Sequence, residues 1–375
     1  MGFRQGSLDK GLEIMFGGFY QGKRVLLTGH TGFKGSWLTC WLQRLGAEVC
    51  GCALPPSTEP SHWRLLNLDI RSEMVDIRDS QALKKLFNDF KPEIVFHLAA
   101  QPLVRASYRD PVGTWSTNVM GTLNVFEACR KTESVLAIIN VTSDKCYENR
   151  KWARGYREDD AMGGYDPYSA SKGCSELLTA SYRNSYFNNG EFGRKHLTLL
   201  ASCRAGNVIG GGDWAEDRLV PDIMRAVSER RPVDIRNPYA TRPWQHVLEP
   251  LSGYLLVGRY LLEKKPEFAA GWNFGPADDA DLSVREVVEN IKLHWDRIDY
   301  RFALDAEAPH EAHLLKLDCA KARKELGWHP VWDSARTFKK TVGWYRAYYE
   351  TGAVTTESDI LEYERAVNLG EVTNG

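Results

Sequence analysis

The chain has 375 residues with a formal net charge of -1, and 43 % of its residues are hydrophobic and 26 % charged. This balance is typical of a globular protein and shows no excess of positive charge that would attract nucleic acid. No apolar run reaches the roughly 18 to 20 residues that a membrane span needs. Residues 1–18 lack an apolar stretch followed by a cleavage pattern, so we expect a loose leader there. We therefore expect a cytoplasmic protein with neither nucleic-acid nor membrane partners.

The first half of the chain alternates short apolar runs with segments of helical spacing. This rhythm predicts an α/β fold with a parallel, doubly wound sheet of the Rossmann type. Strands are expected at residues 25–28, 48–54, 73–77, 94–101, 135–141 and 197–203. Helices are expected before Gly46 and over residues 80–90, 110–131 and 167–187.

Beyond Arg204 the alternation fails, which predicts a smaller C-terminal α/β substrate lobe. Residues 244–263 are expected to form one long helix, and residues 283–295 a shorter one capped by Ser283. The acidic tail after Thr351 has few apolar residues and is expected to lie on the surface or to be disordered. The predicted division is a dinucleotide-binding domain at 20–205 with about 235–263, a substrate domain at 206–234 with 264–350, and terminal segments at 1–19 and 351–375.

The eight cysteines lie at positions 40, 50, 52, 129, 146, 174, 203 and 319. They form no C-x-x-C pair and no His/Cys cluster at zinc spacing, so no metal site is expected. Because most of them stand inside apolar runs, we expect buried free thiols rather than disulfides.

A glycine-rich turn follows the first expected strand and opens a helix. Gly29 allows a tight turn, Gly32 lets a pyrophosphate approach the backbone, and Gly35 lets the helix pack against the strand. Unpaired N–H groups and the dipole at the helix N-terminus favour an anion. We therefore expect the cofactor at Gly29, His30, Thr31, Gly32, Phe33, Lys34 and Gly35.

The cofactor is expected to be NAD, with NADP left open. NAD-binding folds usually place an acidic residue at the end of the second strand to hold the ribose, and Ala53 stands there. His30 and Lys34 add two bulky polar side chains to the turn, so the cofactor is expected to be held loosely. Further expected cofactor contacts are Asp76, Ile77, Leu98, Ala99, Ala100, Gln101, Asn118, Thr142, Tyr168 and Lys172.

Tyr168 and Lys172 are four residues apart on an expected helix and share one face of it. An ammonium beside a phenol favours the phenolate, so the pKa of Tyr168 is expected to fall from about 10 towards neutrality. Tyr168 would then be a base for a sugar hydroxyl. A solvated Tyr/Lys pair has the same spacing. The catalytic interpretation is favoured because residues 98–100 and 142–144 also stand at carboxyl ends of parallel strands.

Four motifs together resemble the extended short-chain dehydrogenase/reductase family: T-G-x-x-G-x-x-G at 28–35, H-x-A-A-Q at 97–101, N-V-x-G-T at 118–122 and Y-x-x-x-K at 168–172. The resemblance implies a Rossmann domain with a nucleotide-sugar lobe, bound NAD(P), and a homodimer or homotetramer. Within this family, residues 29–37, 142–147, 204–214, 242–247 and 309–312 most resemble the CDP-glucose 4,6-dehydratases.

The resemblance implies that CDP-glucose is oxidised at C4, loses water across C5 and C6, and is reduced at C6, which yields a 4-keto-6-deoxy sugar for deoxysugar biosynthesis. The catalytic residues it implies are Ser143, Asp144, Lys145, Tyr168 and Lys172. For Lys145 two roles stay open, the base at C5 and an electrostatic stabiliser of the enolate. The implied substrate-binding residues are Asn207, Arg218, Leu219, Arg242 and His310. Alternatives are another nucleotide-sugar 4,6-dehydratase, a 4-epimerase, or a non-catalytic nucleotide-sugar binding protein.

Overall fold

The computed structural model describes residues 16, 18–235, 237–276, 281–303 and 315–371. At its centre lies a seven-stranded sheet with the order β10-β6-β5-β4-β1-β2-β3, in which every pair of neighbours is parallel. The order reverses between β1 and β4, which is the switch point of a doubly wound sheet. The strands are β1 (Arg24–Thr28), β2 (Glu48–Ala53), β3 (Arg71–Met74), β4 (Ile94–His97), β5 (Ala137–Val141), β6 (Leu199–Ala205) and β10 (Gly271–Phe274).

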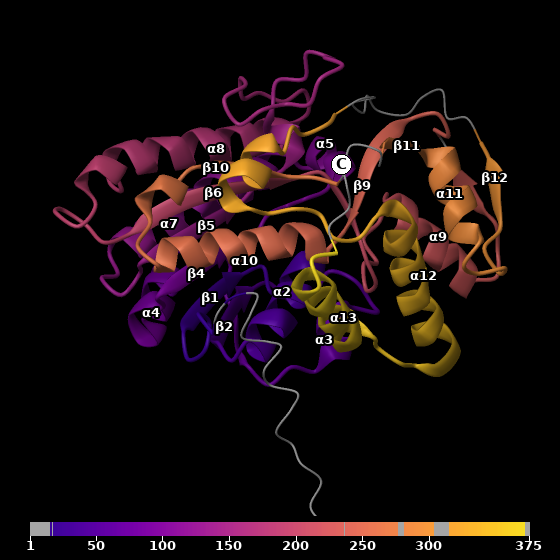
Figure 1. Cartoon of the computed structure of the whole chain (residues 1–375), viewed down its shortest axis with the longest axis horizontal. Helices are drawn as coiled ribbons and strands as arrows, with labels where there is room; N and C mark the ends of the chain where they lie inside the picture. Colours follow the sequence, from indigo (N-terminus) through magenta and orange to yellow (C-terminus); the bar gives the residue numbers. More distant parts are fainter. Residues whose placement is uncertain (1–15, 17, 236, 277–280, 304–314, 372–375) are drawn as a thin grey trace, which may run out of the picture.

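Helices cover both faces of this sheet (Figure 1). Alternate strand residues point to opposite faces, so Val25 and Leu27 of β1 belong to one buried core while Leu26 belongs to another. The first core includes α2 (Phe33–Arg44) and α10 (Leu248–Leu262), and the second includes α4 (Ser80–Phe90), α7 (Thr122–Arg130) and α8 (Pro167–Ser185). The predicted Rossmann-type fold is confirmed.

Shorter helical segments connect these elements and carry several site residues. The expected helix over 110–131 consists of α6 (Pro111–Trp115), a π-helical turn η2 (Ser116–Gly121) and α7. The others are α3 (His62–Leu66), α5 (Val104–Arg109), η3 (Asp144–Cys146), η4 (Asn189–Glu191), η5 (Pro266–Phe268) and η6 (Ala322–Leu326).

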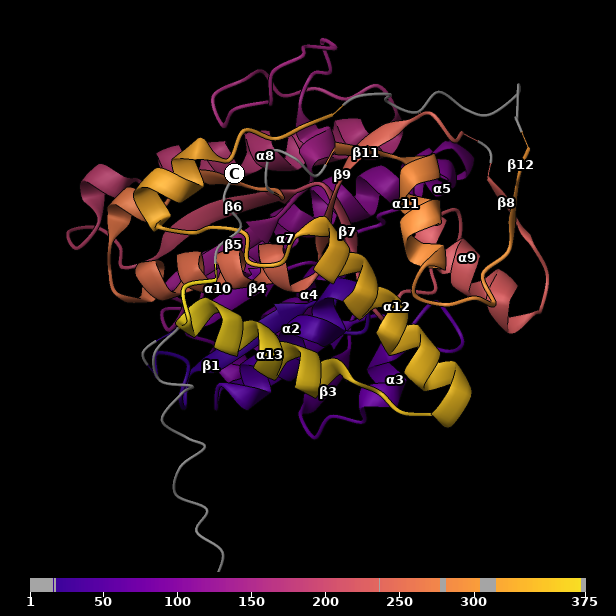
Figure 2. The ribbon, with the colours of Figure 1, turned by 45° about the vertical axis from the view of Figure 1, so that its right-hand side comes forward.

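Two small sheets lie beside the large one, with α9, α11 and α12 around them (Figures 1 and 2). One has the order β11-β9-β7, and the other is the parallel pair β12-β8. Their strands are β7 (Asn207–Ile209), β8 (Val233–Ile235), β9 (Thr241–His246), β11 (Asp281–Ser283) and β12 (Tyr300–Phe302). The helices are α9 (Leu219–Ser228), α11 (Val284–Lys292) and α12 (Ser334–Thr351). Ser283 caps α11 as predicted, and the structure adds a capping box with Glu286.

The expected helix over residues 244–263 is wrong at its start. Trp244 and His246 lie in β9, and α10 begins only at Leu248. The backbone of this stretch pairs with β7, with Trp244 opposite Asn207, so its hydrogen bonds are made across strands. Apolar spacing alone does not distinguish such a short strand from the first turn of the helix that follows.

Two further expectations about the second half need correction. The predicted division places residues 271–274 in the substrate lobe, but β10 pairs with β6 at the edge of the large sheet. The expected surface tail instead forms α13 (Thr356–Asn368), whose Ile360, Tyr363 and Ala366 are buried. The indole nitrogen of Trp41 on α2 donates a hydrogen bond to Glu364 of this helix at 2.9 Å. Packing against α2 therefore fixes the tail despite its acidic composition.

The cysteine prediction is confirmed, since all eight thiols are free and all except the half-buried Cys174 are buried. Among the helices that the structure describes, none is both long and apolar enough to cross a membrane. The expected leader at residues 1–18 lies, apart from Phe16 and Gly18, outside the described residues.

Candidate active site

Gly29, Gly32 and Gly35 form the turn between β1 and α2. Gly29 has a φ of +78°, and a Cβ there would lie 2.8 Å from the backbone nitrogen of Ala99. A Cβ on Gly35 would lie 2.0 Å from the carbonyl oxygen of Gly29. Gly32 is the N-cap of α2, and no side chain caps the first N–H groups of this helix. The residues present therefore fit a pyrophosphate group, because the backbone is bare and its donors face outward from the helix end.

His30 belongs to this turn, and its side chain is fully buried. Its Nε2 is 2.7 Å from the Ser72 hydroxyl, and its ring meets Trp63 edge-on at 4.6 Å between centroids. Burial lowers the pKa of His30 to about 4, so the ring is neutral at pH 7. A Cβ on Gly51 of β2 would lie 2.4 Å from the imidazole, so His30 occupies the space next to this strand. The neighbouring strand end carries Ala53 and no carboxylate.

Asp76 and Ile77 follow β3. The Asp76 carboxylate pairs with Arg78, with 2.6 Å between Oδ2 and Nη2, and this hydrogen bond holds the pKa of Asp76 below its usual value. Ile77 packs under η2, where a Cβ on Gly121 would lie 2.5 Å from its Cδ1 atom. The Thr31 hydroxyl donates to the Leu54 carbonyl at 2.8 Å.

The end of β4 is organised by Asn118. Its side chain accepts a hydrogen bond from the backbone nitrogen of Gln101 at 2.8 Å and donates to the carbonyl of Gln101 at 3.0 Å and to the Ser171 hydroxyl at 2.9 Å. These bonds hold residues 98–101, which are half-buried, against α8. The role of Asn118 seen here is to fix the strand end, and a direct cofactor contact stays a prediction.

Ser143, Asp144 and Lys145 stand at the carboxyl end of β5, where η3 begins. The Ser143 hydroxyl donates to Asp144 Oδ1 at 2.9 Å and accepts from the backbone nitrogen of Lys145 at 3.2 Å. Asp144 is buried, and burial raises its pKa although the charges of Lys145, Arg242 and Lys34 and the Ser143 hydrogen bond oppose this. A carboxyl group with a raised pKa is suited to donate a proton.

Tyr168 and Lys172 lie on α8 and are both buried. Burial raises the pKa of Tyr168 to about 12, and a hydrogen bond with Ser143 and the charge of Arg218 only partly oppose this rise. The expected fall of the Tyr168 pKa towards neutrality is therefore wrong for the protein alone, because loss of hydration outweighs the cationic neighbours. Lys172 donates to the Val141 carbonyl at 3.2 Å, and burial lowers its pKa to about 8.

The structure brings two of the expected substrate residues into electrostatic reach of this cluster. Arg218 acts on Tyr168, and Arg242 acts on Asp144. Asn207 begins β7 and Leu219 begins α9, directly after Arg218. His310 lies outside the described residues.

Sequence reasoning missed Glu176, one turn beyond Lys172 on α8. Its buried carboxylate forms an ion pair with Arg204 at 2.9 Å and accepts hydrogen bonds from Ser202 at 2.7 Å and from Thr142. Burial alone would raise the pKa of Glu176, but Arg204 and these hydrogen bonds hold it below its usual value. The spacing of Tyr168, Lys172 and Glu176 at i, i+4 and i+8 was the signal that could have found it.

A second missed feature is the electrostatic interaction of Lys34 with Asp144, Lys172 and Arg218. Burial lowers the pKa of Lys34 to about 8. The positive charges of Arg218 and Lys172 lower this pKa further, and the charge of Asp144 opposes the shift. The position of Lys34 in the glycine turn suggested only a cofactor contact. Within the described residues, His, Cys, Asp and Glu side chains form no cluster of three or more that could hold a metal ion.

A family model described as GDP-mannose 4,6 dehydratase matches residues 26–341. The chain belongs to this family. A CDP-glucose 4,6-dehydratase of Salmonella typhimurium is 51 % identical, over 93 % of this chain and 98 % of the relative. Ser143, Tyr168 and Lys172 thus stand in a chain that matches a dehydratase over 93 % of its length, as the motifs predict.

Solved structures show the same fold. An epimerase from Methanothermobacter thermautotrophicus superposes with a TM-score of 0.77 at 24 % identity, covering 91 % of this chain and 97 % of the epimerase. A UDP-glucose 4-epimerase of Thermus thermophilus in complex with NAD superposes with a TM-score of 0.73 at 24 % identity, covering 86 % of this chain and 99 % of the epimerase.

Proposed function

We propose that this protein is an NAD-dependent CDP-D-glucose 4,6-dehydratase, which converts CDP-D-glucose to CDP-4-keto-6-deoxy-D-glucose and water. The observation that carries the proposal is the buried group of Ser143, Asp144, Tyr168 and Lys172 where β5 ends beside α8. The full-length similarity to the Salmonella typhimurium CDP-glucose 4,6-dehydratase supports the choice of substrate. The bare glycine turn and the unpaired N–H groups of α2 support a dinucleotide.

When bound, NAD would accept the hydride from C4 of the sugar and return it to C6. Tyr168 takes the proton of the C4 hydroxyl, and Ser143 donates a hydrogen bond to the same oxygen. Because burial raises the pKa of Tyr168 to about 12, its phenolate depends on nearby cations. Lys172 supplies one of these charges from the next turn of α8, and Arg218 supplies another.

The resulting 4-ketone acidifies the hydrogen at C5. Asp144, whose pKa is raised by burial, gives its proton to the C6 hydroxyl, which leaves as water. Lys145 removes the C5 proton in this proposal, with electrostatic stabilisation of the enolate as the alternative, and a proton returns to C5 when C6 is reduced. A Lys145→Ala protein that still exchanged the C5 hydrogen with solvent at the normal rate would exclude the base role.

Arg218 and Arg242 bind the pyrophosphate of the substrate in this proposal, since a guanidinium offers paired donors to phosphate oxygens. Asn207 and the N-terminus of α9 at Leu219 hold a further diphosphate or sugar oxygen. His310 contacts a phosphate or the ribose of the nucleotide sugar in this proposal.

The domain division also belongs to the proposal, with β10 moved to the dinucleotide-binding domain. A homodimer or homotetramer in the cytoplasm is proposed as the working form. Exposed apolar side chains on neighbouring helices support self-association, namely Val112 and Trp115 on α6 and Leu177 on α8. Sedimentation of the purified protein tests the oligomeric state.

The test of the function is one assay of CDP-, UDP-, GDP- and dTDP-glucose with NAD and NADP supplied separately. A 4-keto product that has lost water is expected from CDP-glucose with NAD. A 4-epimerase would change the sugar without losing water. If none of the nucleotide sugars gave a 4-keto product, a non-catalytic binding protein would be the better description.

The same assay tests how firmly the cofactor is held. His30 fills the space beside β2, Lys34 brings a cation to the turn, and Ala53 offers no carboxylate to the ribose. Dialysed protein is therefore expected to need added NAD for full activity. Protein that keeps full cofactor occupancy through dialysis would contradict this expectation.

A further inference from the structure

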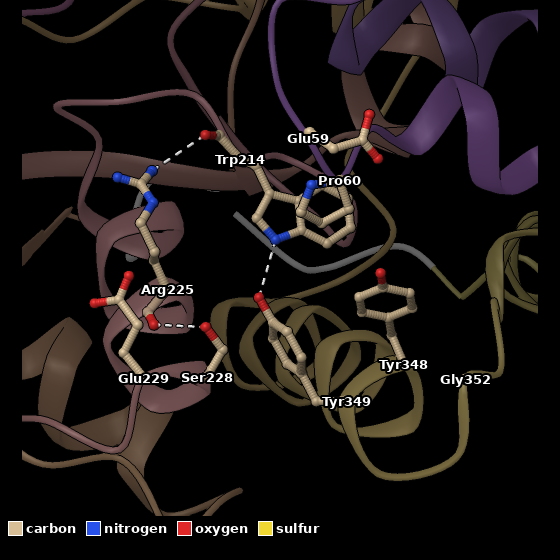
Figure 3. A pocket seen from close by; sticks show the side chains of 9 residues that line it. All are labelled: Glu59, Pro60, Trp214, Arg225, Ser228, Glu229, Tyr348, Tyr349 and Gly352. Carbon is tan, nitrogen blue, oxygen red and sulfur yellow. Dashed lines mark hydrogen bonds between the residues drawn. The ribbon is translucent and has the colours of Figure 1, made fainter.

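The loop between β7 and α9 is fastened to α12 by two tyrosines that lie one helical turn apart. The hydroxyl of Tyr345 accepts a hydrogen bond from the backbone nitrogen of Asp213 at 2.9 Å and donates one to the carbonyl oxygen of the same residue at 2.5 Å. Tyr349 accepts a hydrogen bond from the indole nitrogen of Trp214 at 3.0 Å (Figure 3). Two successive loop residues therefore have separate anchors on one helix.

The two anchored residues face different surroundings. Trp214 lines a pocket of about 560 Å³ together with Tyr348 and Tyr349, and Arg225 donates to its carbonyl oxygen at 3.1 Å (Figure 3). Asp213 is buried instead, and its carboxylate accepts from Arg218 at 2.9 Å and from the backbone nitrogen of Ala215 at 3.0 Å. Asp213 thus connects Tyr345 through its backbone with Arg218 through its side chain.

Asp213 is the ion-pair partner that holds the Arg218 guanidinium in place. The Arg218 side chain is 35 % exposed, and a long arginine side chain loses rotamer entropy when it is held in one place. Its guanidinium charge acts on Tyr168 and on Lys34. A displaced Arg218 would withdraw one of the cations that favour the Tyr168 phenolate.

We propose that Tyr345 is a positioning residue for the dehydratase reaction, which fixes Asp213 so that Asp213 holds Arg218 within electrostatic reach of Tyr168. The inference rests on the proposed function and deepens it. Tyr345 touches neither substrate nor cofactor in this arrangement and acts only through the loop. Its ring is fully buried against Trp344 and Trp214, so a phenylalanine keeps the packing and removes only the hydroxyl.

The test compares Tyr345→Phe with Tyr349→Phe, the same substitution one turn away on the same helix. For Tyr345→Phe, kcat with CDP-glucose is expected to fall about tenfold, the equivalent of about one pKa unit at the base. The KM for the nucleotide sugar is expected to rise, while the KM for NAD stays within about twofold of the wild-type value. Tyr349→Phe is expected to keep the wild-type kinetic constants. Urea unfolding of both variants measures the loss of stability that each hydroxyl causes.

A purely structural role would make the two variants alike, so equal kinetic constants in Tyr345→Phe and Tyr349→Phe would overturn the proposal. Asp213→Asn keeps an oxygen for Ala215 but loses the charge that holds Arg218. It is expected to reproduce the effect of Tyr345→Phe, and the double variant is expected to be no worse than either single one. Additive losses would mean that the two residues act independently, against the proposal.

Labelling of Arg218 with phenylglyoxal separates this proposal from the function itself, because it needs no turnover. Peptide mass spectrometry is expected to show faster modification of Arg218 in Tyr345→Phe than in the wild type or in Tyr349→Phe. Unchanged labelling would refute the anchor even in an active dehydratase. Faster labelling in a protein without dehydratase activity would support the anchor and refute the proposed function.

Discussion

Replacing Gly35 by alanine perturbs the turn between β1 and α2 at its narrowest point. The added Cβ would lie 2.0 Å from the carbonyl oxygen of Gly29 and 2.8 Å from Cα of His30. Carbon and oxygen approach in proteins to about 3.3 Å, so these groups must separate by about 1.3 Å. Both neighbouring atoms belong to the backbone of the turn, so no side-chain rotation can relieve the contact and the turn itself has to open.

Two effects of opposite sign decide the size of the change. Alanine is favoured over glycine inside a helix by about 1 kcal/mol. Overpacking of a close-packed site costs about 1–3 kcal/mol, and a rigid backbone contact places Gly35 at the upper end. We therefore expect Gly35→Ala to lose about 2 kcal/mol of stability and at least about tenfold in NAD affinity, since opening the turn moves the N–H groups that face the pyrophosphate.

Gly343→Ala is the matched control, because Gly343 lies inside α12 and a Cβ there meets no atom within 4 Å. The free energy of unfolding of Gly343→Ala is expected to rise by about 0.5–1 kcal/mol. Urea unfolding followed by tryptophan fluorescence gives the two stabilities, and calorimetric titration gives the NAD affinity. If Gly35→Ala were as stable as Gly343→Ala and bound NAD like the wild type, the close approach would have no consequence and the reasoning would be refuted.

Three other substitutions test buried groups by urea unfolding. Glu176→Gln leaves the Arg204 charge buried without its partner and is expected to cost about 3–5 kcal/mol; a loss below about 1 kcal/mol would contradict this. Burial raises the pKa of Glu249 to about 7, so its contribution to stability is complete below its ordinary value of 4.5 and is lost as the pH rises through 7. Glu249→Gln is therefore expected to match the wild type at pH 4 and to exceed it at pH 8 by up to about 3 kcal/mol, whereas a pH-independent difference would refute the assignment. Tyr363→Ala on α13 is expected to cost about 3–5 kcal/mol, and a negligible loss would restore the prediction of a loosely attached tail.

The sequence was sufficient for β1, β2, β4, β5 and β6, because these strands are short, largely apolar runs between turn residues. The predicted helix over residues 80–90 agrees with α4 at both ends. Trp244 shows where this reasoning stops, since its partners in β7 are set by a pairing that the local pattern does not contain. The same holds for β10, which follows a helix but returns to the large sheet.

For the site, the sequence predicts which residues share a face but not how much water surrounds them. The spacing of Tyr168 and Lys172 suggested a lowered pKa for the phenol, and burial reverses its direction. Glu176 continues the same stripe, yet its role depends on Ser202 and Arg204 of β6, which only the folded sheet brings to α8. The contact between Tyr345 and Asp213 is harder still to predict, because the two residues are 132 positions apart in the sequence.

The contact between α2 and α13 has a consequence for the timing of folding. Trp41 and Glu364, which share a hydrogen bond, are separated by 323 residues. At a synthesis rate of about 5–20 residues per second, about 16–65 s pass between the synthesis of Trp41 and that of Glu364. During that interval the first strands can pair, but the apolar side of α2 has no cover from α13. The growing chain is therefore exposed to misassociation until α13, the last helix that the structure describes, has been made, and slower synthesis lengthens that exposure.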